Sequence, residues 1–309
     1  MDYRRLGNSG LKISEVGLGT NTFGMNADES TSIQIINQAL DLGINFIDTA
    51  AMYARGRSEE IIGKAIKGKR DQVIIATKFG HQASLTPRDL GGSRSYIVRA
   101  VEQNLNRLET DYIDLYYLHY VDTETPIEET LRALNDLIHS GKVRYIACSN
   151  FAAWQLCEAL LSAKIHNLES FIAIQMRYNM LDRSVECEIA PCCEKYGVGL
   201  IPWGPLAGGF LTGKYHRREK PTAGRLASGI QIYGNVLAEP NFDKIDQLGA
   251  FAKERGHSVS ELAIAWLLSH KWLGSVIAGA TSPQQLSANA AASSWKLTAE
   301  DVTQVEKII

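Results

Sequence analysis

The stretch "INFIDTAAMY", residues 44–53, reads as a buried strand that runs into an acid and, five residues later, a phenol. The four residues before Asp48 are apolar or carry an amide, without the strict alternation of a strand that has one face in water. Such strands are typical of parallel sheets that are covered on both faces. This strand delivers Asp48 at its end and Tyr53 in the loop that follows, and the rest of the chain decides which fold surrounds it.

Seven further apolar runs repeat this pattern along the chain. They cover residues 15–20, 72–79, 112–119, 143–150, 171–179, 197–203 and 274–279. Helical patterns lie between them, at residues 30–43, 93–108, 125–142, 258–270 and 282–292. Eight repeats of strand and helix within about 250 residues favour an α/β fold in which eight parallel strands close into a (β/α)8 TIM barrel.

Capping signals give the ends of two of these helices. We expect the first to begin at the cap supplied by residues 30–31, Ser-Thr, and to stop at Gly43. In the helix at 125–142, Thr125 is the expected cap, Pro126 the first helical residue and Gly141 the stop.

The alternative is an open, doubly wound sheet, which would more often carry a GxGxxG turn after its first strand. The first strand here runs into "GLGTNTFGMN", residues 17–26, which lacks that spacing. No linker or low-complexity tract interrupts the chain, so we expect one domain over residues 1–309. An N-terminal β-hairpin with its turn at residues 8–10 and a long loop at 204–235, after the seventh strand, complete the predicted architecture.

The composition excludes several classes of protein. A net charge of −2 without long runs of like charge gives no footprint for nucleic acid. No apolar run reaches about 18 residues, so we expect no membrane span, and the first ten residues lack the apolar core of a signal peptide. The five cysteines form no CxxC pair, and we interpret them as reduced thiols of a cytoplasmic protein with no metal site. The sequence carries no signal for the oligomeric state.

Polar and aromatic side chains stand where the predicted strands end, which is where the active sites of such barrels lie. They are Asp48, Tyr53, Lys78, His119, Ser149, Asn150, Gln175 and Trp203. Taken singly, Asp48 could cap a turn, Tyr53 could be a rim aromatic and His119 could be structural. Lys78 ends an otherwise apolar run, and a buried ammonium needs a partner. Their gathering at one small volume predicts a reaction site.

The proton chemistry of this group suits the reduction of a carbonyl. A tyrosine with a pKa near 10 is a poor acid at neutral pH, and we expect the ammonium of Lys78 to lower the pKa of Tyr53. Asp48 would keep Lys78 charged, and His119 could donate to the same oxygen or relay protons. None of these groups supplies a hydride, so a nicotinamide cofactor is implied.

Over essentially its whole length the sequence resembles the aldo-keto reductase superfamily. The resemblance is carried by "GINFIDTAAMY", "IATKFG", "DLYYLH", "GKVRYIACSNF", "PLAGGFLTGKY" and "IAGATSPQQLSANA". It implies that Tyr53 is the general acid in reduction and the base in oxidation. Lys78 and Asp48 would tune it, and His119 would orient the substrate carbonyl.

The resemblance also implies a set of residues that bind the cofactor, in part through their backbone. They are Gly19, Thr20, Asp48, Ser149, Asn150, Gln175, Trp203, Gly204, Pro205, Leu206, Gly208, Gly209, Lys214, Arg225, Gly279, Thr281, Gln285 and Asn289. Gly204 departs from the serine that is usual in the family. No Lys or Arg lies in residues 277–289 to hold a 2′-phosphate. The pattern there resembles the branch that includes potassium-channel β-subunits, in which an arginine of the long loop helps to hold this phosphate. Arg225 is the matching residue here. NADP(H) is therefore favoured, with NAD(H) as the alternative.

Three functions therefore stay open. The first is an NADP(H)-dependent reductase of small aldehydes, ketones or sugars, whose rim we expect to include Thr22, Phe23, Met25, Tyr53, His81, Tyr120 and Trp203. The second is a cofactor-sensing subunit with little turnover, like the channel-associated relatives. The third is a lyase that uses Lys78 as a Schiff base; Asp48 beside that lysine argues against it, because such a lysine must lose its proton.

Overall fold

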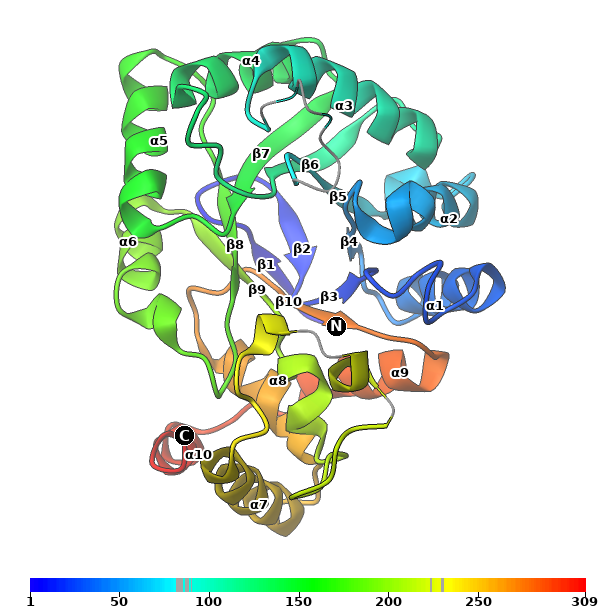
Figure 1. The fold of residues 1–309 in the computed structure, drawn as a ribbon, viewed down its shortest axis with the longest axis vertical. Coiled ribbons are helices and arrows are strands. Elements are labelled where there is room, and N and C mark those ends of the chain that lie inside the picture. The colour runs from blue at the N-terminus through cyan, green and yellow to red at the C-terminus, as the bar shows by residue number, and fades with distance from the viewer. Residues whose placement is uncertain (82–85, 87–88, 90, 223, 229–230) are drawn as a thin grey trace.

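A barrel of eight parallel strands forms the centre of the computed structural model, which describes residues 1–81, 86, 89, 91–222, 224–228 and 231–309 (Figure 1). In barrel order the strands are β10 (Val276–Gly279), β3 (Val16–Gly19), β4 (Phe46–Asp48), β5 (Ile74–Phe79), β6 (Ile113–Leu118), β7 (Val143–Ser149), β8 (Ala173–Arg177) and β9 (Gly199–Trp203). All eight predicted strands are confirmed. β9 and β10 are the two ends of this strand order. They are linked just before β10, where the Gly274 N–H donates to the carbonyl oxygen of Leu200 on β9 at 2.9 Å.

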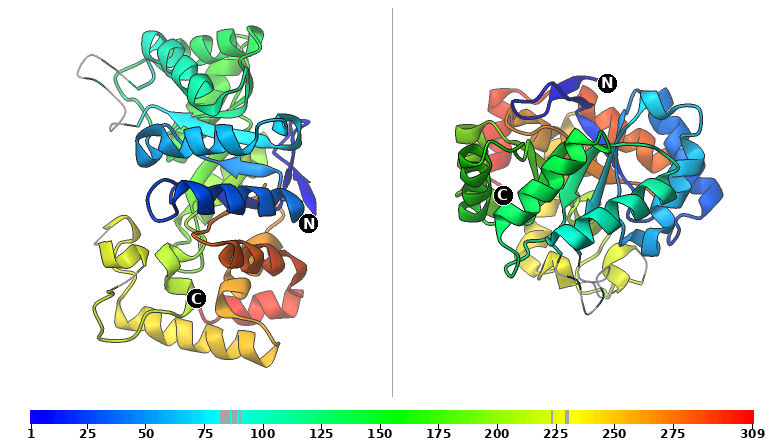
Figure 2. Two further views of the ribbon diagram at one scale, coloured as in Figure 1. Left: turned by 90° about the vertical axis from the view of Figure 1, so that its right-hand side faces the viewer. Right: turned by 90° about the horizontal axis from the view of Figure 1, so that it is seen from above.

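Helices surround the strands, as the two further views in Figure 2 show. They are α1 (Glu29–Asp41), α2 (Arg57–Ala65), α3 (Arg94–Leu108), α4 (Ile127–His139), α5 (Ala153–Ile165), α6 (Ile189–Tyr196), α7 (Glu239–Glu254), α8 (Val259–Ser269), α9 (Pro283–Ala291) and α10 (Ala299–Glu306). Apolar side chains between the helices and the outer face of the barrel form the larger core, and a smaller core fills the barrel itself. Within the described residues, no helix is long and apolar enough to cross a membrane.

The N-terminal hairpin contributes to the smaller core. Its strands β1 (Tyr3–Arg5) and β2 (Lys12–Ser14) pair antiparallel, as predicted. Leu6 and Ile13 belong to the same apolar cluster as Phe46 and are fully buried with it. The barrel wall is tight here, because a Cβ at Gly17 would come within 2.7 Å of the Phe46 ring.

Two predicted helix starts are wrong by one or a few residues. The N-cap of α1 is Asp28, whose carboxylate accepts a hydrogen bond from the Thr31 N–H at 2.8 Å. Asp28 therefore caps the helix in place of the Ser-Thr pair at residues 30–31. The N-cap of α4 is Pro126 and not Thr125, because the Thr125 hydroxyl donates to Asp122 at 2.7 Å. The glycine stop after α4 is confirmed: Gly141 follows the helix with a φ of 78°.

Candidate active site

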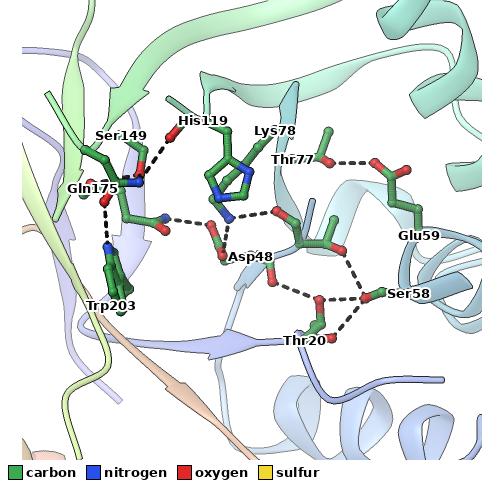
Figure 3. A network of polar contacts seen from close by, with 12 residues as sticks. Thr20, Asp48, Ser58, Glu59, Thr77, Lys78, His119, Ser149, Gln175 and Trp203 are labelled. Carbon is green, nitrogen blue, oxygen red and sulfur yellow. Dashed lines mark hydrogen bonds and ion pairs between the residues drawn. The ribbon is translucent and has the colours of Figure 1, made fainter. Parts of the chain in front are cut away.

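The ammonium of Lys78 lies buried at the carboxyl end of β5, and its partners come from β4 and the loop after it. Its Nζ is 2.5 Å from the Asp48 Oδ1 and donates to the Thr49 carbonyl oxygen at 2.8 Å. The second carboxylate oxygen of Asp48 accepts from the Gln175 amide at 2.8 Å (Figure 3). Burial by itself would lower the pKa of Lys78, but the Asp48 carboxylate, and after it the Tyr53 phenol, raise it above its ordinary value. Lys78 is therefore a paired and charged group, which does not suit a Schiff base.

Tyr53 reaches this pair through a strained turn. Ala54, Arg55 and Gly56 follow it with φ values of 47°, 57° and 90°, a left-handed run that only glycine adopts without cost. The turn leaves the Tyr53 ring centroid 5.2 Å from the Nζ of Lys78. The ammonium therefore lies within electrostatic reach of the phenol.

The expected lowering of the phenol pKa is wrong in direction. Burial raises the pKa of Tyr53 above its ordinary value, and the charge of Lys78 offsets this only in part. The loss of water around the phenol outweighs the charge of the ammonium. Tyr53 is thus a protonated hydroxyl throughout the neutral range, the form in which a phenol can give up a proton.

His119 completes the cluster at the end of β6. Its ring centroid lies 6.3 Å from that of Tyr53, in an edge-to-face arrangement, and it is close to His81 and Tyr120. Burial, followed by the charge of Lys78, holds the pKa of His119 well below its usual value. Its Nδ1 is buried and has no hydrogen-bond partner among the described residues. His119 is therefore a neutral imidazole that can donate one N–H beside the phenol.

Four amide, hydroxyl and indole groups lie on the next strand ends. The Ser149 hydroxyl donates to the Gln175 carbonyl oxygen at 2.9 Å, and the Asn150 amide donates to the Ser149 hydroxyl and to the His119 carbonyl oxygen. The Trp203 indole N–H donates to the Asn150 side-chain oxygen at 3.2 Å. Asn150 has a φ of 59°, a conformation that asparagine tolerates better than most residues. The structure thus brings these four predicted residues together beside Asp48.

The segment after β9 forms a tight, glycine-lined bend. Gly204, Gly208 and Gly209 have φ values of 67°, 68° and 92°. A Cβ at Gly208 would come within 2.9 Å of the Tyr233 ring, and one at Gly209 within 2.9 Å of the Nζ of Lys214. The positive φ values favour glycine at these positions, and the Gly209 backbone lies close to the Lys214 ammonium.

Three more of the predicted residues accompany this bend. Between its glycines, Pro205 is buried and Leu206 is half-buried against the large core. Arg225, from the long loop, places its guanidinium carbon 5.9 Å from the Tyr233 ring centroid. Burial raises the pKa of Tyr53, and the positive charge of Arg225 offsets a small part of that rise. This loop therefore lies within electrostatic reach of the phenol.

The remaining predicted residues meet at β3, β10 and the start of α9. Gly19 pairs with Gly279 on one side and with Asp48 on the other, and the Thr20 hydroxyl donates to the Asp48 carbonyl oxygen at 2.9 Å. Two further contacts link the others: the Thr281 hydroxyl donates to the Gln285 side-chain oxygen at 3.1 Å, and the Asn289 amide donates to the Gly279 carbonyl oxygen at 3.2 Å.

The predicted rim needs one correction. Phe23 is fully buried in the large apolar core and does not line an opening. Its N–H donates to the Thr20 carbonyl oxygen, which turns the chain and carries the ring inward. Met25 and Tyr120 are exposed, as a rim residue requires.

The sequence reasoning missed a second polar cluster behind the site. The buried carboxylate of Glu59 accepts from Thr77, Asn104 and Arg107 at 2.5 to 2.6 Å. Figure 3 shows the contact with Thr77. The neighbouring Ser58 hydroxyl donates to Thr20. Both residues lie in the first turn of α2, directly after the Tyr53 turn, so they fix the position of that turn.

A sequence signal for this cluster existed. Glu59, Ile62 and Ile66 follow helical spacing and share one buried face, which makes Glu59 an acid on an apolar stripe. The described residues contain no cluster of three or more His, Cys, Asp or Glu side chains that could hold a metal ion.

Comparison with known proteins agrees with this geometry. The sequence profile of the aldo/keto reductase family matches residues 15–309. A probable voltage-gated potassium channel subunit beta from Oryza sativa subsp. japonica is 38% identical, with 100% of this chain and 97% of that protein aligned. The aldo-keto reductase YhdN from Bacillus subtilis is 37% identical over 100% of this chain and 94% of its own length. Versiconal hemiacetal acetate reductase from Aspergillus parasiticus is 37% identical, over 99% and 96%.

Proposed function

The chain belongs to the aldo/keto reductase family, and on that premise we propose that it reduces small aldehydes or ketones, sugars among them, to alcohols with NADP(H). Membership makes the protein an oxidoreductase of a family that uses nicotinamide cofactors. The observation that carries the finer proposal is the buried Lys78 ammonium, which bonds to the Asp48 carboxylate and lies 5.2 Å from the centroid of the Tyr53 ring.

Each member of the cluster has a part in moving one proton. The Tyr53 hydroxyl donates to the carbonyl oxygen of the substrate as that oxygen gains negative charge. Lys78 stabilises the phenolate that is left, and Asp48 holds Lys78 in place. His119, being neutral, donates an N–H to the same oxygen and orients it. In the direction of oxidation the phenolate takes the proton back.

The residues around the site fit a nicotinamide cofactor. The glycine bend after β9, with Lys214 against it, suits a pyrophosphate, and α9 directs its N-terminus to the same side as the end of β10. Ser149, Asn150 and Gln175 offer hydrogen-bonding groups next to Asp48 for a carboxamide. When bound, the cofactor supplies the hydride that the protein lacks. NADP(H) is favoured over NAD(H) because Arg225, on the long loop, carries a positive charge that suits an additional phosphate.

The test is a titration followed by a turnover assay. NADPH and NADH are added to the pure protein, and quenching of its tryptophan fluorescence reports binding, with Trp203 next to the site. The better cofactor is then used with a panel of aldehydes, ketones and sugars. We expect tighter binding of NADPH and steady oxidation of it by some carbonyls. Equal or tighter binding of NADH would overturn the NADP(H) preference and leave the reaction class standing.

The second candidate is a cofactor-binding subunit with little turnover. It is favoured by the relatives named as potassium-channel β-subunits. Tight cofactor binding with negligible oxidation on the whole panel would support it against the reductase.

A further inference from the structure

Four of the five cysteines lie on one side of the barrel, outside the site. They are Cys148 on β7, Cys157 on α5, and Cys192 and Cys193 on α6. Helices α5 and α6 lie side by side at the edge of the molecule in Figure 1. Nothing in the proposed reduction uses these thiols.

Two of the four are in direct contact across the helices. The sulfur of Cys157 is 3.2 Å from the sulfur of Cys192. A disulfide bond of about 2 Å would need them to approach by only about 1 Å. Because the two helices already pack together, no large movement of the backbone separates the dithiol from the disulfide.

The two thiols differ in their access to solvent. Cys157 is half-buried, so a small oxidant can reach it, whereas Cys192 is 8% exposed. Burial, and then a hydrogen bond to Cys157, raises the pKa of Cys192 to about 12. Cys157 is therefore the more accessible of the two sulfurs, and Cys192 keeps its proton at neutral pH.

We propose that Cys157 and Cys192 are a peroxide-sensitive thiol pair that closes to a disulfide between α5 and α6. The Cys157 thiolate attacks one oxygen of hydrogen peroxide, the O–O bond breaks, and hydroxide leaves with a proton as water. The resulting sulfenic acid is attacked by the sulfur of Cys192, which gives its proton to the departing hydroxyl. The S–S bond forms and a second water leaves. The two thiols lose two electrons in total, and the peroxide gains them.

The first test is a peptide map of the full-length protein. The reduced protein is treated with hydrogen peroxide, free thiols are blocked, and the digest is analysed by mass spectrometry with and without a reductant. We expect a peptide pair joined through Cys157 and Cys192 that separates on reduction. Recovery of both cysteines as free thiols, while the exposed Cys187 is oxidised in the same sample, would overturn the proposal. A disulfide to Cys193 would overturn it too.

Serine variants then assign the two roles. Cys192→Ser should accumulate a sulfenic acid on Cys157, detected with a carbon nucleophile that labels sulfenic acids. Cys157→Ser should show no such label on Cys192, which stays protonated. The matched control is Cys187→Ser, which should form the same disulfide as the parent protein. Equal labelling of the two single variants would contradict the assignment.

A thermal measurement adds a readout that does not depend on labelling. The bond would close a loop between residues that are 35 positions apart, and such a closure restricts the unfolded chain. The oxidised protein should therefore melt several degrees higher than the reduced protein, and a reductant should reverse the shift. In Cys157→Ser the peroxide should cause no rise, and a rise of equal size there would contradict the proposal.

Discussion

Two buried ion pairs lie on opposite sides of one strand and differ in what surrounds them. Lys78 on β5 points into the barrel and bonds to Asp48. Its neighbour Thr77 points outward and donates to Glu59, which also bonds to Arg107. Successive residues of a strand face opposite sides, so a single step along the chain separates the two clusters.

The difference lies in the groups that remain available. Three donors bind the Glu59 carboxylate, and its partners are held between β5, α2 and α3. The inner pair instead has a protonated phenol and a neutral imidazole beside it, and the imidazole nitrogen Nδ1 is unsatisfied within the described part of the chain. An ion pair whose hydrogen bonds are all made stabilises the fold and holds the neighbouring turn in position. The inner pair leaves a phenol and an imidazole that can react with a substrate.

Removing the inner charge should have the largest effect on turnover. In Lys78→Met the phenol loses the cation that stabilises its anion, and we expect turnover to fall by about 10² to 10⁴-fold. The orphaned Asp48 can take up a proton, since burial already raises the pKa of its carboxyl. Steady-state kinetics on samples with native circular dichroism would measure the loss. The control is Lys64→Met, which removes an exposed lysine paired with Glu29 and should stay near the parent rate.

Removing the outer charge should act mainly on stability. Glu59→Gln presents an amide to three donors and leaves Arg107 without a counter-charge, at a cost of about 3 kcal/mol in the free energy of unfolding. Turnover at full folding should fall less than in Lys78→Met. Urea denaturation and kinetics at low temperature would measure the two effects separately.

The adjacent Glu60 gives a matched control for this change. It is half exposed and pairs with Arg57 at the surface, so Glu60→Gln should change the free energy of unfolding by about 0.5 kcal/mol or less. A Glu59→Gln protein that is as stable as Glu60→Gln, or as inactive as Lys78→Met, would remove the distinction between the two ion pairs.

The pH dependence of reduction should follow the protonation of the inner cluster. The pKa of Tyr53 is raised, so the acid form is complete at neutral pH and is lost only as the pH passes above 10. The pKa of His119 lies well below its usual value, so the imidazole stays neutral until strongly acidic pH. We therefore expect kcat/KM for reduction to be flat between about pH 6 and 9. A fall centred near neutral pH would show that another group supplies the proton.

The smallest effect should come from the turn that joins the two regions. Ala54 has a φ of 47°, so Ala54→Gly should relieve local strain and change the stability by about 1 kcal/mol or less. Turnover should change little, because the turn remains fixed by Ser58 and Glu59. A loss of turnover as large as in Lys78→Met would show that the alanine itself holds the phenol in place.

The sequence predicted the barrel and the inner cluster for the same physical reason. Strands buried on both faces have a strong apolar signal, and charged groups at their ends stand out against it, as Lys78 does. The pKa of Tyr53 was misjudged, because the depth of burial depends on packing from distant segments. Glu59 was missed, because its three donors come from two other elements, Thr77 from β5 and Asn104 and Arg107 from α3. The burial of Phe23 likewise depends on a turn that the apolar pattern does not encode.

The central claim is that the Tyr53 hydroxyl gives the proton to the substrate. The most direct test compares Tyr53→Phe with the parent protein in a single turnover with bound cofactor and a carbonyl from the panel. We expect the affinity for the cofactor to stay within about threefold of the parent, since Tyr53 is not one of the residues assigned to cofactor binding. The rate should fall by at least about 100-fold. A Tyr53→Phe protein that reduces the carbonyl at near the parent rate would contradict the account.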